Sequence, residues 1–194
     1  MAKLVEVRWH GRGGQGAKTA ALLLAEAASD AGGKYIQAFP EYGPERMGAP
    51  VQAFTRISDA PITMHCNVTN PGTVVILDSS LIGGSVDVTS GVGESGVYIV
   101  NTNATPEEMR AKLGIKAGKV YTVDANQIAL DTIGRAIPNT PMMGALIKVT
   151  GILPLETLLA DTEKKLNKKF AGRAQIVEGN LQAIKRAYQE VKGE

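Results

Sequence analysis

A glycine-rich turn near the amino terminus is the segment of this sequence best suited to bind a ligand. An apolar stretch over residues 4–9 leads into this turn, and an alanine-rich stretch follows from Ala17 to about residue 31. The order predicts a strand, a tight turn and a helix, as at the start of a Rossmann-like unit. Glycines allow close approach to the backbone, and a helix N-terminus attracts negative charge. The expected anion site consists of Gly11, Arg12, Gly13, Gly14, Gln15 and Gly16.

Neither common nucleotide-binding motif is complete at this turn. The glycine spacing fits G-x-G-x-x-G, but a dinucleotide site also needs an acidic residue at the end of the second strand, about 20 residues further on. That strand is expected at residues 35–39, which contain no carboxylate; the first one after the strand is Glu41. In the phosphate-loop motif a lysine directly follows the last glycine, whereas Ala17 precedes Lys18 here. A turn that only packs the helix tightly on the sheet is the alternative interpretation.

A second loop, residues 38–50, combines turn-forming residues with charged side chains. Glycine and proline make such a loop rigid, so it can hold a side chain in one direction. Arg46 can present a fixed two-pronged donor to a carboxylate or phosphate, or it can form a local ion pair with Glu41 or Glu45. Both interpretations stay open, and Arg46 joins the candidate binding residues.

Four polar residues follow predicted strands at the edge where open α/β sheets bind ligands. They are Asp78, Ser79, Asn101 and Asn103. The alternative role for these side chains is to form local hydrogen bonds to the backbone of the loops in which they lie.

Cysteine and histidine are too few for most metal or nucleophilic chemistry. Cys66 is the single cysteine, so this chain cannot supply a four-cysteine iron–sulfur or zinc site. His10 and His65 are the only histidines, and neither has the spacing of a metal motif. Neighbours on an extended strand point to opposite faces, so we expect Cys66 and His65 to pack rather than to act as a catalytic pair. We predict no catalytic residue and no metal site in this chain.

Continuous apolar runs predict an α/β, Rossmann-like three-layer fold. The expected strands are residues 4–9, 35–39, 51–57, 73–77, 97–100 and 120–123. Strands without alternation are buried on both faces, which indicates a mostly parallel sheet with helices on both sides. The short connection between the second and third strands predicts one antiparallel pair. With 194 residues, the chain is expected to form one domain over residues 1–194.

Helices are expected between and after the strands. Thr105-Pro106-Glu107-Glu108 has the pattern of a capping box with proline at the first helical position, and Asp124 can cap a further helix. Other helices are expected over residues 140–151 and 155–170. Apolar residues spaced by four, three, four and three residues form a stripe on the last helix, which packs on its own sheet or on another subunit. The stripe consists of Val177, Leu181, Ile184, Tyr188 and Val191.

The charge balance gives no basis for binding nucleic acid or a membrane surface. The chain has 21 basic and 19 acidic residues, a formal net charge of +2. No apolar run approaches the roughly 20 residues of a membrane span. We therefore expect a cytoplasmic protein with neither nucleic-acid nor membrane partners.

Several motifs occur together along almost the whole chain. They are Arg8-Trp9-His10-Gly11-Arg12-Gly13-Gly14-Gln15-Gly16-Ala17-Lys18, Gln37-Ala38-Phe39-Pro40-Glu41-Tyr42-Gly43, Glu45-Arg46 with Gly48-Ala49-Pro50, Val123-Asp124-Ala125, and Pro138-Asn139-Thr140-Pro141-Met142 with Gly144-Ala145. In this combination the sequence resembles the gamma subunits of 2-oxoacid:ferredoxin oxidoreductases, most closely the pyruvate synthase (pyruvate:ferredoxin oxidoreductase) type. Met47 is a departure, because arginine is common at that position in the family.

The resemblance implies a multisubunit enzyme of anaerobic metabolism that converts pyruvate, coenzyme A and oxidised ferredoxin into acetyl-CoA, CO2 and reduced ferredoxin. Alpha, beta and delta subunits are the implied partners, and ferredoxin is the acceptor. Thiamine diphosphate, Mg and [4Fe-4S] clusters would sit on those partners, and this chain alone would be inactive. The resemblance favours a contribution of the glycine turn to the coenzyme A region.

Alternative functions remain at this point. The same kind of complex can act on 2-oxoglutarate, a branched-chain or aryl oxoacid, or oxalate, since the pocket for the oxoacid would belong largely to partner subunits. A purely structural subunit shares the same fold and complex. A free-standing enzyme that binds NAD, FAD or ATP would require the nucleotide motif that is incomplete here.

Overall fold

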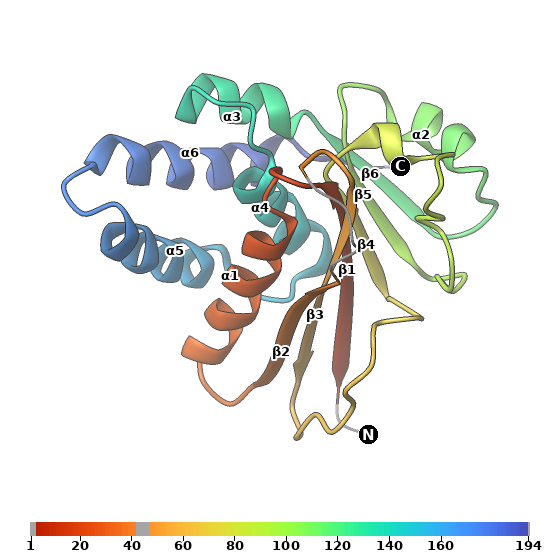
Figure 1. The fold of residues 1–194 in the computed structure, drawn as a ribbon, viewed down its shortest axis with the longest axis horizontal. Helices are drawn as coiled ribbons and strands as arrows, with labels where there is room; N and C mark the ends of the chain where they lie inside the picture. The colour runs from red at the N-terminus through yellow and green to blue at the C-terminus, as the bar shows by residue number, and fades with distance from the viewer. Residues whose placement is uncertain (1–2, 42–46, 194) are drawn as a thin grey trace.

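A computed structural model describes residues 3–41 and 47–193, and its centre is one seven-stranded sheet (Figure 1). The strands are ordered β2-β3-β1-β4-β5-β6-β7 across the sheet. Their bounds are β1 (Leu4–Arg12), β2 (Tyr35–Glu41), β3 (Pro50–Ser58), β4 (Thr73–Ile76), β5 (Val97–Asn101), β6 (Lys119–Val123) and β7 (Lys192–Gly193). The six strands expected from the sequence are all present, and the two-residue β7 is added at the carboxyl end.

Strand directions agree with a mostly parallel sheet. Strands β1, β4, β5 and β6 are mutually parallel, and β2 runs the same way because it is antiparallel to β3, which is antiparallel to β1. The antiparallel pair expected from the short connection between the second and third strands is present as β2 and β3, but β3 also pairs in this way with β1, and β7 with β6. The reason is that β3 inserts between β1 and β2, where a Rossmann unit would pair those two strands directly.

Helices cover the two faces of the sheet unequally (Figure 1). The α-helices are α1 (Ala17–Asp30), α2 (Pro106–Leu113), α3 (Ala125–Ile133), α4 (Asn139–Thr150), α5 (Leu155–Lys169) and α6 (Ala174–Glu190). All of them except α2 lie on one side of the sheet, which we call the inner face. The outer face is covered by α2 and by irregular segments, which include the short 3-10 helix η1 (Ser79–Leu81).

On the inner face, α4 is the central helix and α6 packs against other helices. Residues Thr140 to Ile147 of α4 are all buried, so this helix is covered around its whole circumference over two turns. Gly144 lets α6 approach closely, because a Cβ there would lie 2.2 Å from the carbonyl oxygen of Ile184. Gly179 has the same role against the carbonyl oxygen of Thr132 on α3, at 2.3 Å. The apolar stripe of α6 therefore meets helices rather than the sheet.

The outer face is apolar over β4 to β6, whereas over β1 to β3 it carries charged side chains beside the aromatic pair of Phe39 and Phe54. The apolar half packs Met109 and Leu113 of α2 against strand residues such as Tyr98. The expected capping box of α2 is present, with Glu108 N–H donating to Thr105 and Thr105 N–H donating to Glu108. No helix among the described residues is both long and apolar enough to cross a bilayer.

Two buried arginines lie on the outer face over β1 to β3. Arg56 forms an ion pair with Glu6 at 2.7 Å and donates to the carbonyl oxygens of Cys66 and Asn67. Arg8 donates from Nε to His10 Nε2 at 2.9 Å, and its Nη2 donates to the carbonyl oxygen of Ser90 at 2.7 Å. These bonds tie irregular segments onto the sheet where no helix covers it.

Candidate functional site

The candidate site lies where β1 and β4 end, at the position where chain connections change direction. From β1 the chain goes through α1 toward β2, and from β4 it goes the other way toward β5. Open α/β sheets bind ligands at such switch points, just beyond the carboxyl ends of the strands. The glycine turn follows β1 and residues 77–80 follow β4, so this edge brings together two of the predicted segments.

The glycine turn is attached to the second loop by backbone hydrogen bonds. Gly13 N–H donates to Ala49 O at 2.9 Å, and Gly48 N–H donates to Gly13 O at 3.3 Å. Gly14 and Gly16 have φ of 99° and 84°, a region that other L-residues rarely adopt. The glycine turn and residues 48–49 of the second loop are therefore joined, at the end of the antiparallel β1 and β3 pair.

Asn139 at the start of α4 packs directly beneath the turn. A Cβ on Gly16 would lie 2.8 Å from Asn139 Nδ2 and 2.9 Å from Asn139 Cβ, so the position has no space for a side chain. Asn139 also accepts a hydrogen bond from the Thr140 hydroxyl, which is bonded to Asn180 of α6 as well. The turn is thus supported from below by two helices.

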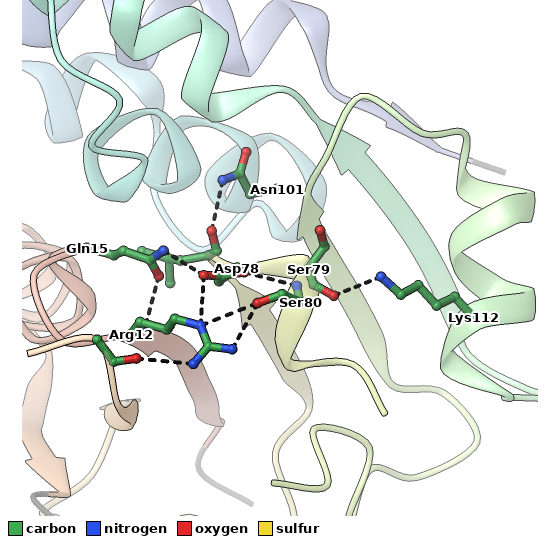
Figure 2. Close-up of polar contacts among 9 residues, drawn as sticks. Arg12, Gln15, Asp78, Ser79, Ser80, Asn101 and Lys112 are labelled. Carbon is green, nitrogen blue, oxygen red and sulfur yellow. Dashed lines mark hydrogen bonds and ion pairs between the residues drawn. The ribbon is translucent and has the colours of Figure 1, made fainter. Parts of the chain in front are cut away.

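Arg12 extends across the switch point and contacts the segment after β4 (Figure 2). Its Nε lies 3.2 Å from Asp78 Oδ2 and 3.3 Å from Ser80 Oγ, and its Nη2 donates to Ser80 Oγ at 3.0 Å. Its Nη1 donates to Gly48 O at 3.1 Å. Arg12 therefore joins the glycine turn, the second loop and the segment after β4.

Asp78 is the centre of this network (Figure 2). It accepts from Gln15 Nε2 at 2.8 Å and from Ser80 N–H at 3.0 Å, and Gln15 in turn accepts from Arg12 N–H at 2.8 Å. Burial pushes the pKa of Asp78 upward, but hydrogen bonds from Ser80 and Gln15 and the charge of Arg12 outweigh it, so the pKa lies below its ordinary value. Asp78 is thus an anion at neutral pH.

A cavity of about 320 Å³ lies beside the N-terminus of α1. Its wall combines the glycine turn, the first turn of α1 and the ends of β2 and β3. The lining residues are Arg12, Gly13, Gly14, Gly16, Ala17, Lys18, Thr19, Pro40, Glu41, Val51 and Gln52. The wall combines the cationic side chains of Arg12 and Lys18 and the first turn of α1 with the carboxylate of Glu41. Cations beside a helix N-terminus suit a phosphate.

Two of the other polar residues after β4 and β5, Ser79 and Asn101, make hydrogen bonds that hold elements of the fold together. Asn101 is 4% exposed, donates to Leu77 O at 2.8 Å and accepts from Asn126 N–H at 3.2 Å, so it ties β4 to α3. The carbonyl of Ser79 accepts from Lys112 at 3.0 Å. Asn103 is exposed and lines a separate cavity of about 430 Å³ near α2. Of Asp78, Ser79, Asn101 and Asn103, only Asp78 contacts the glycine turn.

The remaining candidates are placed as follows. Arg46 lies outside the described residues, whereas Glu41 accepts a hydrogen bond from Asn67 at 2.9 Å.

Cys66 and His65 are both exposed in an irregular segment, so the expectation that they pack on a strand is wrong. The segment crosses the outer face over β1 to β3, held through the Cys66 carbonyl by Arg56. Within residues 3–41 and 47–193, no three acidic, histidine or cysteine side chains cluster in a way that could hold a metal ion.

Comparison with known proteins decides the family. Residues 6–190 match the family model described as pyruvate ferredoxin/flavodoxin oxidoreductase. The chain belongs to this family. The resemblance inferred from the sequence motifs is therefore confirmed.

The relatives of this oxidoreductase-family chain match it over almost its full length. Pyruvate synthase subunit PorC of Thermotoga maritima is 50% identical over 190 residues, which cover 98% of this chain and 96% of that protein. The pyruvate/ketoisovalerate oxidoreductases common subunit gamma of Thermococcus litoralis is 47% identical, covering 96% and 97%. The crystal structure of pyruvate oxidoreductase subunit PORC from Thermotoga maritima matches with a TM-score of 0.86 at 48% identity, covering 99% of both chains.

Sequence reasoning missed two residues of this family member's site. Ser80 accepts two bonds from Arg12, although it lies 68 positions away in the sequence. Asn139 determines the space beneath Gly16 but belongs to a distant helix. The motif that contains Asn139 resembles the family in sequence, but the position of Asn139 beneath the turn depends on how α4 packs.

Proposed function

We propose that this chain is the gamma subunit of a multisubunit 2-oxoacid:ferredoxin oxidoreductase that acts on pyruvate. The observation that carries the proposal is the 50% identity to a pyruvate synthase subunit over 98% of this chain. The complex joins pyruvate and coenzyme A to form acetyl-CoA and CO2, and it passes the electrons to ferredoxin in the cytoplasm. Alpha, beta and delta subunits are the partners. Other 2-oxoacids are the alternative substrates, because a relative at 47% identity is named for both pyruvate and ketoisovalerate.

Thiamine diphosphate with Mg, and the iron–sulfur clusters, belong to the partner subunits in this proposal. A single cysteine cannot ligate a [4Fe-4S] cluster, which takes four thiolates. The described residues also lack a group of three acidic, histidine or cysteine side chains suited to a metal ion. The single cysteine does not fit a [4Fe-4S] cluster, and the described residues offer no such group for the Mg, so no redox step is assigned to this chain.

The contribution of this chain is to receive phosphate groups of coenzyme A at the glycine turn. Support comes from Arg12 and Lys18, two cationic residues that line the cavity beside α1 together with Gly13, Gly14 and Gly16. Phosphate oxygens accept hydrogen bonds from backbone N–H groups at a helix N-terminus and from guanidinium groups. Coenzyme A needs no ribose-binding carboxylate of the dinucleotide type; Glu41 ends β2, but β3 separates β2 from β1, unlike in a Rossmann unit. Arg46 is a further candidate for this role by sequence.

The test is anaerobic purification of the tagged chain from its host, with native mass spectrometry of the subunits and cofactors that accompany it. We expect thiamine-binding and cysteine-rich subunits, and a complex that reduces ferredoxin with pyruvate only when coenzyme A is present. A chain that purifies alone with NAD or ATP would overturn the proposal. Pyruvate, 2-oxoglutarate, ketoisovalerate, an aryl oxoacid and oxalate are compared as substrates.

Arg12→Ala in the intact complex separates a role at coenzyme A from a purely structural one. A role at coenzyme A predicts a raised KM for coenzyme A and an unchanged KM for pyruvate. A structural subunit predicts that both constants stay the same while subunit assembly weakens. Lys168→Ala, at an exposed position on α5, is the matched loss of one positive charge.

A further inference from the structure

Arg12 is held by acceptors of this chain and still has donors available. The contacts to Asp78, Ser80 and Gly48 use Nε, one N–H of Nη2 and one N–H of Nη1. A guanidinium carries five N–H groups, so the contacts with residues 3–41 and 47–193 leave one on each terminal nitrogen. The Arg12 side chain is 35% exposed, which leaves it accessible to a ligand at the switch point.

Asp78 holds both ends of Arg12. Its carboxylate lies 3.2 Å from the guanidinium and accepts from Gln15, whose own carbonyl oxygen accepts from the Arg12 backbone at 2.8 Å. The backbone and the charged end of Arg12 are thus both fixed relative to one carboxylate (Figure 2). A side chain that is fixed before binding loses less conformational entropy when its ligand arrives.

The same carboxylate also has an opposing effect. Its negative charge partly cancels the positive charge of Arg12, which weakens attraction for an anion. If charge cancellation were the main effect, removal of Asp78 would improve anion binding. If orientation is the main effect, removal of Asp78 weakens binding even though the site becomes more positive.

We propose that Asp78, with Gln15, is a positioning residue that aims Arg12 at a phosphate of coenzyme A. The proposal rests on the proposed function, because it requires coenzyme A at the glycine turn. Orientation outweighs charge cancellation here because three groups hold the Asp78 carboxylate at once: the side chains of Arg12 and Gln15 and the backbone N–H of Ser80. The remaining two N–H groups of Arg12 then meet the phosphate oxygens in a fixed direction.

The experiment measures steady-state kinetics of the assembled complex with Asp78→Ala, Asp78→Asn, Arg12→Ala and the double variant Arg12→Ala with Asp78→Ala. We expect Asp78→Ala to raise the KM for coenzyme A about tenfold, the scale of one lost hydrogen bond to a charged group. The kcat at saturating coenzyme A and the KM for pyruvate stay the same. The double variant should be no worse than Arg12→Ala, since Asp78 acts through Arg12. Asp59→Asn, at an exposed carboxylate paired with Lys34, is the control.

Two results would overturn the inference in different ways. A lower KM for coenzyme A in Asp78→Ala, with a raised KM in Arg12→Ala, would mean that Asp78 only cancels charge, and the proposed function would stand. An unchanged KM in Arg12→Ala and Asp78→Ala would remove coenzyme A from this turn altogether. Asp78→Asn removes the charge and keeps one of the two acceptor oxygens, so it is measured if the alanine variant does not assemble: a raised KM for coenzyme A supports orientation, and a lowered KM means that Asp78 only cancels charge.

Discussion

Asn139 fills the space that a side chain at Gly16 would occupy, which links the glycine turn to the start of α4. Gly14, two residues earlier, has a similarly positive φ, but no atom of the described residues lies within 4 Å of its Cβ position. Comparing substitutions at Gly14 and Gly16 therefore separates the cost of a left-handed backbone from the cost of a clash with Asn139. Both effects can be measured in the purified chain.

Gly16→Ala should destabilise the chain more than Gly14→Ala. Each substitution costs about 1–2 kcal/mol for a left-handed backbone, and the clash with Asn139 adds about 1–3 kcal/mol at Gly16 alone. Urea unfolding monitored by circular dichroism measures the difference. Equal losses in the two variants would show that Asn139 moves away without cost.

Arg56→Met should strongly destabilise the sheet. The Arg56 side chain is 2% exposed, and its loss leaves Glu6 and the carbonyls of Cys66 and Asn67 without their donor. Removing one partner of a buried ion pair costs about 3–5 kcal/mol. Lys34→Met, which breaks the exposed pair with Asp59, is the control and should change the unfolding midpoint little. A midpoint for Arg56→Met equal to that of the control would contradict the structural role.

His10 should make the chain less stable as the pH falls below about 6.5. Burial, followed by the nearby charge of Arg8, lowers the pKa of His10 from 6.5 to about 3. Between these values the unfolded chain binds a proton that the folded chain does not, so the free energy of unfolding decreases as the pH falls. Above pH 6.5 the contribution of His10 to stability is constant. The loss is about 2 kcal/mol between pH 6.5 and 5.

Denaturant unfolding at pH 7, 6 and 5 tests this contribution in the chain with His10→Gln, whose amide oxygen can still accept from Arg8. The variant should lack that part of the pH dependence. His65→Gln, at an exposed position, should keep it. The explanation fails if both variants follow the same pH curve as the unchanged chain.

Asn101→Leu should reduce stability without changing the KM for coenzyme A. The substitution leaves the Leu77 carbonyl and the Asn126 N–H without the Asn101 side chain as partner, at about 1–3 kcal/mol for each group. Asn103→Leu, at an exposed position, should have a small effect on stability. Unfolding and kinetics are measured on the same preparations. A large change in KM with unchanged stability would return Asn101 to the list of ligand-binding residues.

Local patterns in the sequence predicted the elements well. The capping box at Thr105 and the cap at Asp124 depend on residues within one helical turn, so they form wherever the chain adopts a helix. The Gly14 and Gly16 turn follows from local backbone needs in the same way. These features required no knowledge of the rest of the molecule.

Features that depend on distant contacts were not predictable from one sequence. The insertion of β3 between β1 and β2 is a choice of pairing, and the run over residues 51–57 would look the same at the edge of the sheet. Asp78 was expected near ligands in general, yet its contact with Arg12 joins residues 66 positions apart. The packing of α6 on α4 depends on Gly144, whose role appears only when the two helices are placed together.

The position of β3 limits how this scaffold could be re-engineered. The end of β2 is two strands away from β1, or about 10 Å at the usual strand spacing. Glu41 already ends β2 and lines the cavity beside the turn, but with β3 in between, its carboxylate stands one strand farther from β1 than the ribose-binding acid of a Rossmann unit. Cofactor exchange in this protein would require a new strand order, and point substitutions cannot provide one.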